Sequence, residues 1–162
     1  MAENQTLDAL QTPGAVFFIF GATGDLARRK LFPAIYSLYR EGKLAQDFAV
    51  IGVARRPRTQ DEFRSDIKES IREFCRYQAE SESEWNQFVE HFEYKSLDIN
   101  NIDGFRELHA QTEILEEKFH IPGNRLFYLA LAPELFGSVS FNLKEGGMLE
   151  SRGWNRLVIE KP

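Results

Sequence analysis

A glycine-rich turn near the start of the chain carries the residues best suited to chemistry. Residues 21–27 read Gly-Ala-Thr-Gly-Asp-Leu-Ala, which matches the spacing Gly-x-x-Gly-x-x-Ala, a variant of the dinucleotide-binding turn. Gly21 permits the tight turn, Gly24 lets a pyrophosphate approach the backbone, and Ala27 lets a helix lie close to a sheet. The first amides of that helix and its dipole favour negative charge. The alternative for such a pattern taken alone is an ordinary turn.

The surroundings of the turn favour a nucleotide site. Residues 15–20 (Ala-Val-Phe-Phe-Ile-Phe) form a continuous apolar run, typical of a strand buried on both faces. A helix is predicted from Asp25, with a kink near Leu31 caused by Pro33. Because the turn joins a buried strand to a helix, we predict a dinucleotide site here. Its residues would be Gly21, Ala22, Thr23, Gly24, Asp25, Leu26, Ala27 and Arg28.

The end of the second predicted strand, residues 48–53, indicates which dinucleotide is bound. Enzymes that use NAD usually carry an acidic residue at this point, whereas this chain continues Ala54-Arg55-Arg56, with Arg58 close by. Guanidinium groups suit a 2′-phosphate through charge-assisted, bidentate hydrogen bonds. We therefore expect NADP, without excluding NAD; the alternative is a solvated basic loop. Lys30 lies about a turn and a half along the first helix, near enough to reach into the cleft.

The remaining elements alternate between strands and helices. They are a helix opened by a capping box at residues 59–62, a short helix near 85–89, a strand at 92–97, a helix carrying apolar residues over 105–119, a strand at 126–132, a helix from Pro133 and a strand at 157–159. Right-handed crossovers then require a parallel sheet with helices on both faces. We predict an α/β, Rossmann-type doubly wound domain over residues 15–162, preceded by a mobile tail at 1–14.

Composition limits the function classes. The 162 residues are 43% hydrophobic, enough for one substantial core, and the net charge of −5 is spread along the chain, which argues against nucleic-acid binding. The longest apolar runs fall far short of the roughly 20 residues of a membrane span, and the first residues do not resemble a signal peptide. The single cysteine, Cys75, fits a reducing cytosol. No spacing typical of metal ligands is present. The ending Val158–Pro162 reads as a cut within a longer protein.

Two further features test other readings. The three histidines, His91, His109 and His120, fall in ordinary surface contexts and are expected to have no catalytic role. A short-chain reductase needs a Tyr-x-x-x-Lys pair late in the fold, but that spacing occurs only at Tyr39–Lys43, on the wrong side of the predicted fold. A non-enzymatic NADP-binding redox sensor stays open as an alternative.

Four segments together resemble the glucose-6-phosphate dehydrogenase family. They read Gly-Ala-Thr-Gly-Asp-Leu-Ala-Arg-Arg-Lys-Leu-Phe-Pro (21–33), Gly-Val-Ala-Arg (52–55), Asn-Arg-Leu-Phe-Tyr-Leu-Ala-Leu-Ala-Pro (124–133) and Gly-Trp-Asn-Arg-Leu-Val-Ile-Glu-Lys-Pro (153–162). The resemblance implies an NADP-dependent enzyme, in some members also NAD-dependent, that oxidises glucose 6-phosphate to 6-phosphogluconolactone at the entry to the pentose phosphate pathway. The single cysteine and the lack of a signal-peptide pattern lead us to expect a cytoplasmic location.

The resemblance also implies residue roles. Residues 21–28 would be the pyrophosphate loop and Arg55 the 2′-phosphate contact. Tyr128 would lie on the coenzyme side, and Asp98 and Ile99 at the adenine edge.

The last residues match the family's substrate side. Lys161 would touch both substrate and coenzyme, Lys30 would face the substrate, and Pro162 would act as a hinge between domains. The sequence 131–133, Leu-Ala-Pro, departs from the common Leu-Pro-Pro. The family's catalytic Asp-His-Tyr-Leu-Gly-Lys segment and its general-base histidine would lie beyond residue 162, so we expect no catalytic residue in this chain. Homo-oligomers would form through the second domain, which this chain lacks.

Overall fold

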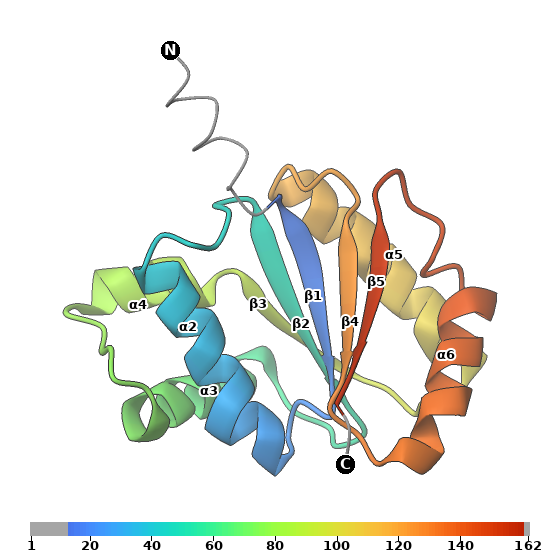
Figure 1. The fold of residues 1–162 in the computed structure, drawn as a ribbon, viewed down its shortest axis with the longest axis horizontal. Coiled ribbons are helices and arrows are strands. Elements are labelled where there is room, and N and C mark those ends of the chain that lie inside the picture. Colours follow the sequence, from blue (N-terminus) through green and yellow to red (C-terminus); the bar gives the residue numbers. More distant parts are fainter. Residues whose placement is uncertain (1–12, 161–162) are drawn as a thin grey trace.

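Five parallel strands form the centre of the protein in the computed structural model, which describes residues 13–160 (Figure 1). The strands are β1 (Ala15–Phe20), β2 (Phe48–Ala54), β3 (Phe92–Ser96), β4 (Arg125–Leu129) and β5 (Asn155–Ile159). Their order in the sheet is β3-β2-β1-β4-β5, and every neighbouring pair is parallel. The chain therefore adds β2 and β3 on one side of β1, and then returns to add β4 and β5 on the other side. Ligands of such sheets bind beyond the carboxyl ends of the strands at this switch point.

Helices cover both faces of the sheet. The helical segments are η1 (Ala27–Leu31), α2 (Phe32–Arg40), α3 (Gln60–Phe74), α4 (Glu82–Val89), α5 (Ile102–Lys118), η2 (Pro133–Leu135) and α6 (Phe136–Glu145). Helices α2, α3 and α4 lie on one face, and α5 and α6 lie on the other (Figure 1). This arrangement confirms the predicted doubly wound α/β fold.

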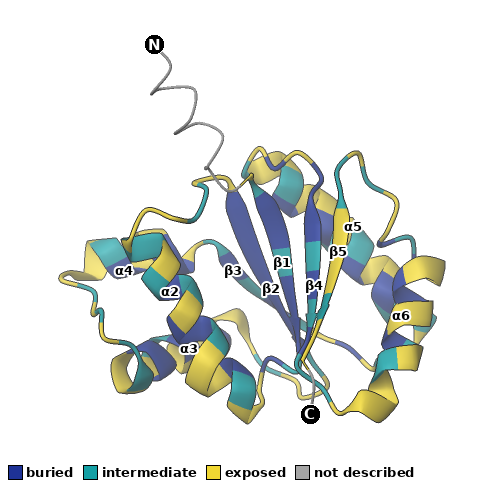
Figure 2. Ribbon diagram, in the orientation of Figure 1, coloured by how far each residue is buried: buried dark blue, intermediate teal, exposed yellow. Residues whose placement is uncertain are grey.

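Successive side chains along a strand point to opposite faces of the sheet, and this divides the core into two layers. In β1, Val16, Phe18 and Phe20 pack with α5 and α6, whereas Ile19 packs with α2, α3 and α4. Figure 2 shows that β1 and β2, at the centre of the sheet, are buried except for one residue of intermediate exposure in each. The edge strand β5 differs, because Leu157 and Ile159 remain 45% and 48% exposed.

The first helical segment contains the irregularity expected from Pro33. Residues Ala27–Leu31 form a π-helical turn in which the Phe32 amide donates to the carbonyl of Ala27, five residues back. The regular helix α2 then begins at Phe32, with Pro33 in its first turn. Proline is tolerated there because its missing N–H falls at a point where the helix changes its hydrogen-bond spacing.

The predicted boundaries differ most at β4. The strand expected at 126–132 covers Arg125–Leu129. Ala130 still donates its amide to the Phe20 carbonyl at 2.9 Å, but β1 ends at Phe20 and its chain turns away at Gly21, so no neighbouring strand continues the ladder. Residues 1–12 of the predicted tail lie outside the described residues. The helices within residues 13–160 are too short or too polar to cross a membrane.

Candidate coenzyme-binding site

The glycine-rich turn lies at the switch point, between the carboxyl end of β1 and η1. The amides of Gly21 and Ala22 both donate to the carbonyl of Val53 at the end of β2, at 2.9 and 3.2 Å. Gly21 has a φ of +89°, and a Cβ at this residue would lie 2.2 Å from the carbonyl oxygen of Ala130. Only glycine suits this position, since any side chain would meet the backbone that follows β4.

Gly24 has a different role from Gly21. A Cβ on Gly24 would meet only the carbonyl oxygen of Gly21, at 3.2 Å, and the residue is exposed. Gly24 therefore keeps the outer face of the turn free of a side chain, whereas Gly21 is needed for its positive φ. Ala27, which is fully buried among the residues that pack α2 and α3, brings η1 close to the sheet as predicted.

Two residues predicted to bind the coenzyme make ion pairs on the helix surface. Asp25 accepts a 2.6 Å hydrogen bond from Arg29, and Arg28 pairs with Glu73 of α3. The guanidinium groups of Arg28 and Arg29 both lie 5.2 Å from the ring centre of Phe74. These contacts tie the first helix to α3. Thr23 is exposed and Leu26 is half-buried.

A pocket of about 210 Å³ lies beside the turn. Its lining residues come from the turn, η1 and α2, the loop after β2, and α3: Ala22, Thr23, Arg28, Phe32, Arg56, Arg58, Asp66 and Glu69. The turn and the basic loop, adjacent only in the fold, therefore share one hollow at the end of β2. Arg55 does not line this pocket; its predicted role as the 2′-phosphate contact stays a prediction.

The loop after β2 is held by its backbone. Tyr94 donates its hydroxyl to the carbonyl of Arg56, and Ser96 donates to the carbonyl of Arg55 at 3.1 Å. Burial raises the pKa of Tyr94, so its hydroxyl stays a donor at neutral pH. The side chains of Arg55 and Arg56 make no ion pair with any residue in the range 13–160. Anchored backbone with unpaired guanidinium groups is an arrangement suited to binding an anion.

The helix behind the pocket begins as the sequence predicts. Thr59 caps α3 by accepting from the Glu62 amide at 3.1 Å, and the Glu62 carboxylate accepts from the Thr59 amide at 2.9 Å. This capping box fixes where α3 starts. It thereby sets where Asp66, one turn further along, meets the basic loop.

The predicted adenine-edge residues form a turn between β3 and α5. The Asp98 carboxylate accepts from the Asn100 amide at 2.9 Å, and the carbonyl of Ile99 accepts from the Asn142 side chain of α6 at 2.7 Å. They lie at the same carboxyl-terminal edge of the sheet as the pocket, but outside its lining. Their adenine contact stays a prediction.

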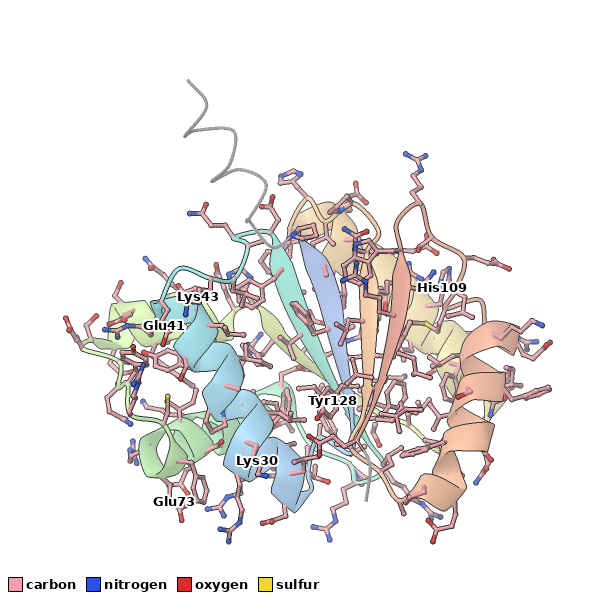
Figure 3. All side chains as sticks on the ribbon, in the orientation of Figure 1. Lys30, Glu41, Lys43, Glu73, His109 and Tyr128 are labelled. Carbon is pink, nitrogen blue, oxygen red and sulfur yellow. The ribbon has the colours of Figure 1, made fainter. Side chains whose placement is uncertain are left out.

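The substrate-side residues lie at this edge as far as the structure describes them. Figure 3 shows Lys30 and Tyr128 at the end of the molecule where the strands finish. The Tyr128 hydroxyl donates to the Glu160 carboxylate at 2.6 Å; burial first, and this carboxylate second, raise the pKa of Tyr128 to about 12. Lys30 is exposed and makes no ion pair within residues 13–160. Lys161 and Pro162 lie outside the described residues.

The expectation that the histidines occupy ordinary surface contexts is wrong for His91. Its ring stacks between Phe48 and Phe119, with ring centres 4.2 and 4.6 Å away, and its Nδ1 lies 2.7 Å from the Phe48 carbonyl oxygen. Burial lowers the pKa of His91. Because the partners come from distant segments, the local sequence around His91 could not reveal the stack.

The sequence also did not reveal a buried charged cluster on the α5 side of the sheet. Arg125, 1% exposed, donates to both carboxylate oxygens of Glu116, at 2.7 and 3.2 Å, and to the Met148 carbonyl at 2.8 Å. The terminal nitrogen that donates to Met148 also lies 3.2 Å from Nδ1 of His109. Arg125 starts β4, at the opposite edge of the sheet from the pocket, so this cluster supports the fold and not the site.

The Tyr39–Lys43 pair lies at the far end of α2. Figure 3 shows Lys43 and Glu41 at the end of the helix opposite Lys30, and the two form an ion pair of 2.9 Å. Tyr39 packs against the aromatic rings of Phe48 and Phe88. The pair is therefore remote from the turn, as the sequence predicted.

Comparison with known proteins agrees with the geometry. The family described as "Glucose-6-phosphate dehydrogenase, NAD binding domain" matches residues 18–162. Glucose-6-phosphate 1-dehydrogenase of Bacillus subtilis (strain 168) is 45% identical over 152 residues, which cover 94% of this chain and 30% of that protein. The enzyme of Leuconostoc mesenteroides is 43% identical over 143 residues, covering 88% and 29%.

A solved structure shows the same fold. It is described as glucose-6-phosphate dehydrogenase in complex with its substrate glucose-6-phosphate, and it superposes with a TM-score of 0.82 at 34% identity, covering 94% of this chain and 31% of that one. The chain thus spans about three tenths of the length of the relatives that it matches. Its fold, its glycine-rich turn and the family match together show that the chain belongs to the glucose-6-phosphate dehydrogenase family and carries that family's NAD-binding domain.

Proposed function

We propose that residues 15–162 bind NADP, as the coenzyme domain of an enzyme that oxidises glucose 6-phosphate to 6-phosphogluconolactone. The observation that carries the proposal is the pocket in which the glycine-rich turn faces Arg56 and Arg58. It lies at the carboxyl ends of β1 and β2, beside the switch point between β1 and β4, and dinucleotides bind at this end of the sheet in this fold class.

The residues present fit a dinucleotide. The open outer face of Gly24 leaves room for a pyrophosphate, and the dipole of the following helix favours its charge. The unpaired guanidinium groups of Arg55 and Arg56, with Arg58 beside them, supply donors for a 2′-phosphate. NAD lacks that phosphate and would forgo these bonds. We therefore propose a preference for NADP with weaker binding of NAD.

The substrate side of the reaction rests on the family's residues. The relatives in this comparison are glucose-6-phosphate 1-dehydrogenases, and one solved relative holds glucose 6-phosphate. Bound NADP supplies a hydride acceptor. In this chain, Lys30 and Lys161 would attract the phosphorylated sugar, and Tyr128, which remains a neutral donor because its pKa is raised to about 12, would help to order the coenzyme side.

The reaction also needs a general base near the sugar hydroxyl, and lysines at their ordinary pKa are protonated at neutral pH. The His91 ring is stacked between Phe48 and Phe119, and the half-buried His109 contacts Arg125 and Glu113. We propose that the 162-residue chain binds NADP without turnover, that oligomers need the remainder of the protein, and that the enzyme is cytoplasmic.

Calorimetric titration of the 162-residue chain with NADP and with NAD tests the binding proposal. We expect NADP to bind more tightly than NAD. Absence of binding by either nucleotide to a folded chain would refute the proposal. Incubation with NADP and glucose 6-phosphate should produce no absorbance of the reduced nicotinamide. Growth of that absorbance in proportion to the amount of pure chain would require a base within these residues.

A further inference from the structure

Arg58 is incompletely satisfied in the folded protein. Within residues 13–160 its Nε is the one buried side-chain nitrogen or oxygen without a hydrogen-bond partner. Its terminal nitrogen pairs with the carboxylate of Asp66 on α3. Buried polar atoms are nearly always paired, so an orphaned donor beside a pocket calls for an explanation.

The placement of Arg58 is fixed rather than adaptable. Pro57 restricts the backbone before it, Tyr94 holds the Arg56 carbonyl, and the Thr59 cap begins α3 directly after it. Its side chain is 31% exposed, and that of Asp66 is 47% exposed. The guanidinium group therefore stands at the pocket wall with one side committed to Asp66 and its Nε unused.

The carboxylate of Asp66 has two effects on an anion entering this pocket. It occupies the terminal nitrogen of Arg58, from which a phosphate would otherwise accept a hydrogen bond. It also places a negative charge in the pocket wall, close to the incoming anion. A ligand without a phosphate at this point would feel neither effect. Unfavourable elements of this kind set specificity as much as attractive contacts do.

We propose, resting on the proposed NADP function, that Asp66 is a determinant of coenzyme specificity: by holding Arg58, it limits the advantage of NADP over NAD. When NADP binds, its 2′-phosphate competes with Asp66 for Arg58. The pair thus lets the domain accept both coenzymes, with the balance set by one carboxylate.

Substitution of Asp66 tests the proposal, with both nucleotides titrated by calorimetry. Asp66→Asn keeps the shape and removes the charge, and its exposed position means that the fold should survive, which circular dichroism checks. We expect the NADP dissociation constant to fall by about three- to tenfold, with that of NAD unchanged within about twofold. Arg58→Gln should weaken NADP by about tenfold or more.

Two further variants separate pairing from general charge. In Arg58→Gln, adding Asp66→Asn should no longer bring the full gain, because the released partner is gone. Glu145→Gln removes an equal charge from the exposed end of α6, on the other face of the sheet and away from the pocket, and should change NADP affinity by less than about twofold.

The outcomes distinguish the two levels of the proposal. If the unmodified chain binds neither nucleotide, the proposed function fails. If it binds both but Asp66→Asn leaves the ratio of NADP affinity to NAD affinity unchanged or lowers it, or if Glu145→Gln raises that ratio equally, the role assigned to Asp66 is overturned.

Discussion

Arg58 and Arg125 use the same side chain in opposite ways. Arg125 is buried on the α5 side of the sheet, and its guanidinium bonds to Glu116, the Met148 carbonyl and the His109 ring. Arg58 lines the pocket at the other edge of the sheet, with its Nε unpartnered.

The difference shows that the burial of an arginine does not by itself indicate whether it supports the fold or binds a ligand; the hydrogen-bond partners of its guanidinium group decide that. A buried arginine whose three guanidinium nitrogens all have partners within the protein stabilises the fold and has little left to offer a ligand. An arginine at a pocket wall with an unpaired buried donor lowers the stability of the folded protein, and a ligand that accepts a hydrogen bond from that donor removes this loss. In this domain, the satisfied arginine lies at the amino ends of the strands, and the unsatisfied one lies at the carboxyl ends, where ligands bind.

The largest expected effect comes from breaking the buried pair. Arg125→Met should destabilise the domain by about 3–5 kcal/mol, because it leaves Glu116 as a largely buried carboxylate without its cation. Urea denaturation measures the loss. Adding Glu116→Leu to Arg125→Met should restore part of the stability. A loss below about 1 kcal/mol would show that Arg125 is not a structural centre.

A second substitution changes the glycine-rich turn and leaves the core unchanged. Gly24→Val should abolish nucleotide binding, because a branched side chain would stand on the open face of the turn, where the pyrophosphate must approach. The fold should survive, since a Cβ here meets only one carbonyl oxygen, at 3.2 Å. Gly24→Ala should give an intermediate loss. Retained binding by calorimetry, with unchanged circular dichroism, would place the site elsewhere.

A third substitution tests the basic loop itself. Arg55→Ala should weaken NADP binding by one to two powers of ten, corresponding to about 1.5–3 kcal/mol for a charged hydrogen bond, and should leave NAD nearly unchanged. Arg152→Ala serves as control, because this exposed arginine precedes β5 and so lies at the amino ends of the strands, away from the pocket. Equal losses for NADP and NAD would show that Arg55 is a surface charge or a structural support.

The smallest expected effect concerns the pH dependence of stability and the stacked ring of His91. The pKa of His91 is lowered in the folded protein, so the unfolded chain takes up its proton first as the pH falls below about 6.5. His91 therefore contributes stability at neutral pH that is lost on acidification. His91→Gln cannot titrate in this range, and should lose less stability than the unmodified chain between about pH 7.5 and about pH 5.5.

Urea midpoints at the two pH values measure this difference. His120→Asn is a suitable control, since His120 is exposed and its φ of +56° suits asparagine. If His91→Gln and the unmodified chain lose equal stability, the stacked ring is not the source of the pH dependence.

The fold was predictable because its signals are local. The apolar run of β1, the glycines after it and the Thr59–Glu62 cap each specify an element within a few residues. The turn and the basic loop could also be assigned to one end of the sheet, because both follow parallel strands. The shortfall at β4 arose because the apolar sequence continues past the point where its neighbour β1 ends.

The pairings in space were not predictable in the same way. Nothing in the sequence near Arg58 indicates that Asp66 holds it, and Arg125 has its partners on α5 and near Met148. His91 was read as a surface residue because its stacking partners, Phe48 and Phe119, come from other elements. Such contacts depend on the crossing of helices over the sheet, which residue type and spacing do not specify.

The half-exposed edge strand bears on how the chain behaves at high concentration. Among residues 13–160, strand β5 pairs only with β4, and its other side offers backbone donors and acceptors beside Leu157 and Ile159. An apolar, unpaired edge of this kind is a template for sheet-to-sheet self-association. The apparent molar mass of the chain from light scattering should therefore rise with concentration. Leu157→Lys should suppress that rise by placing a charge on the edge strand. An equal rise for the two proteins would show that self-association uses another surface.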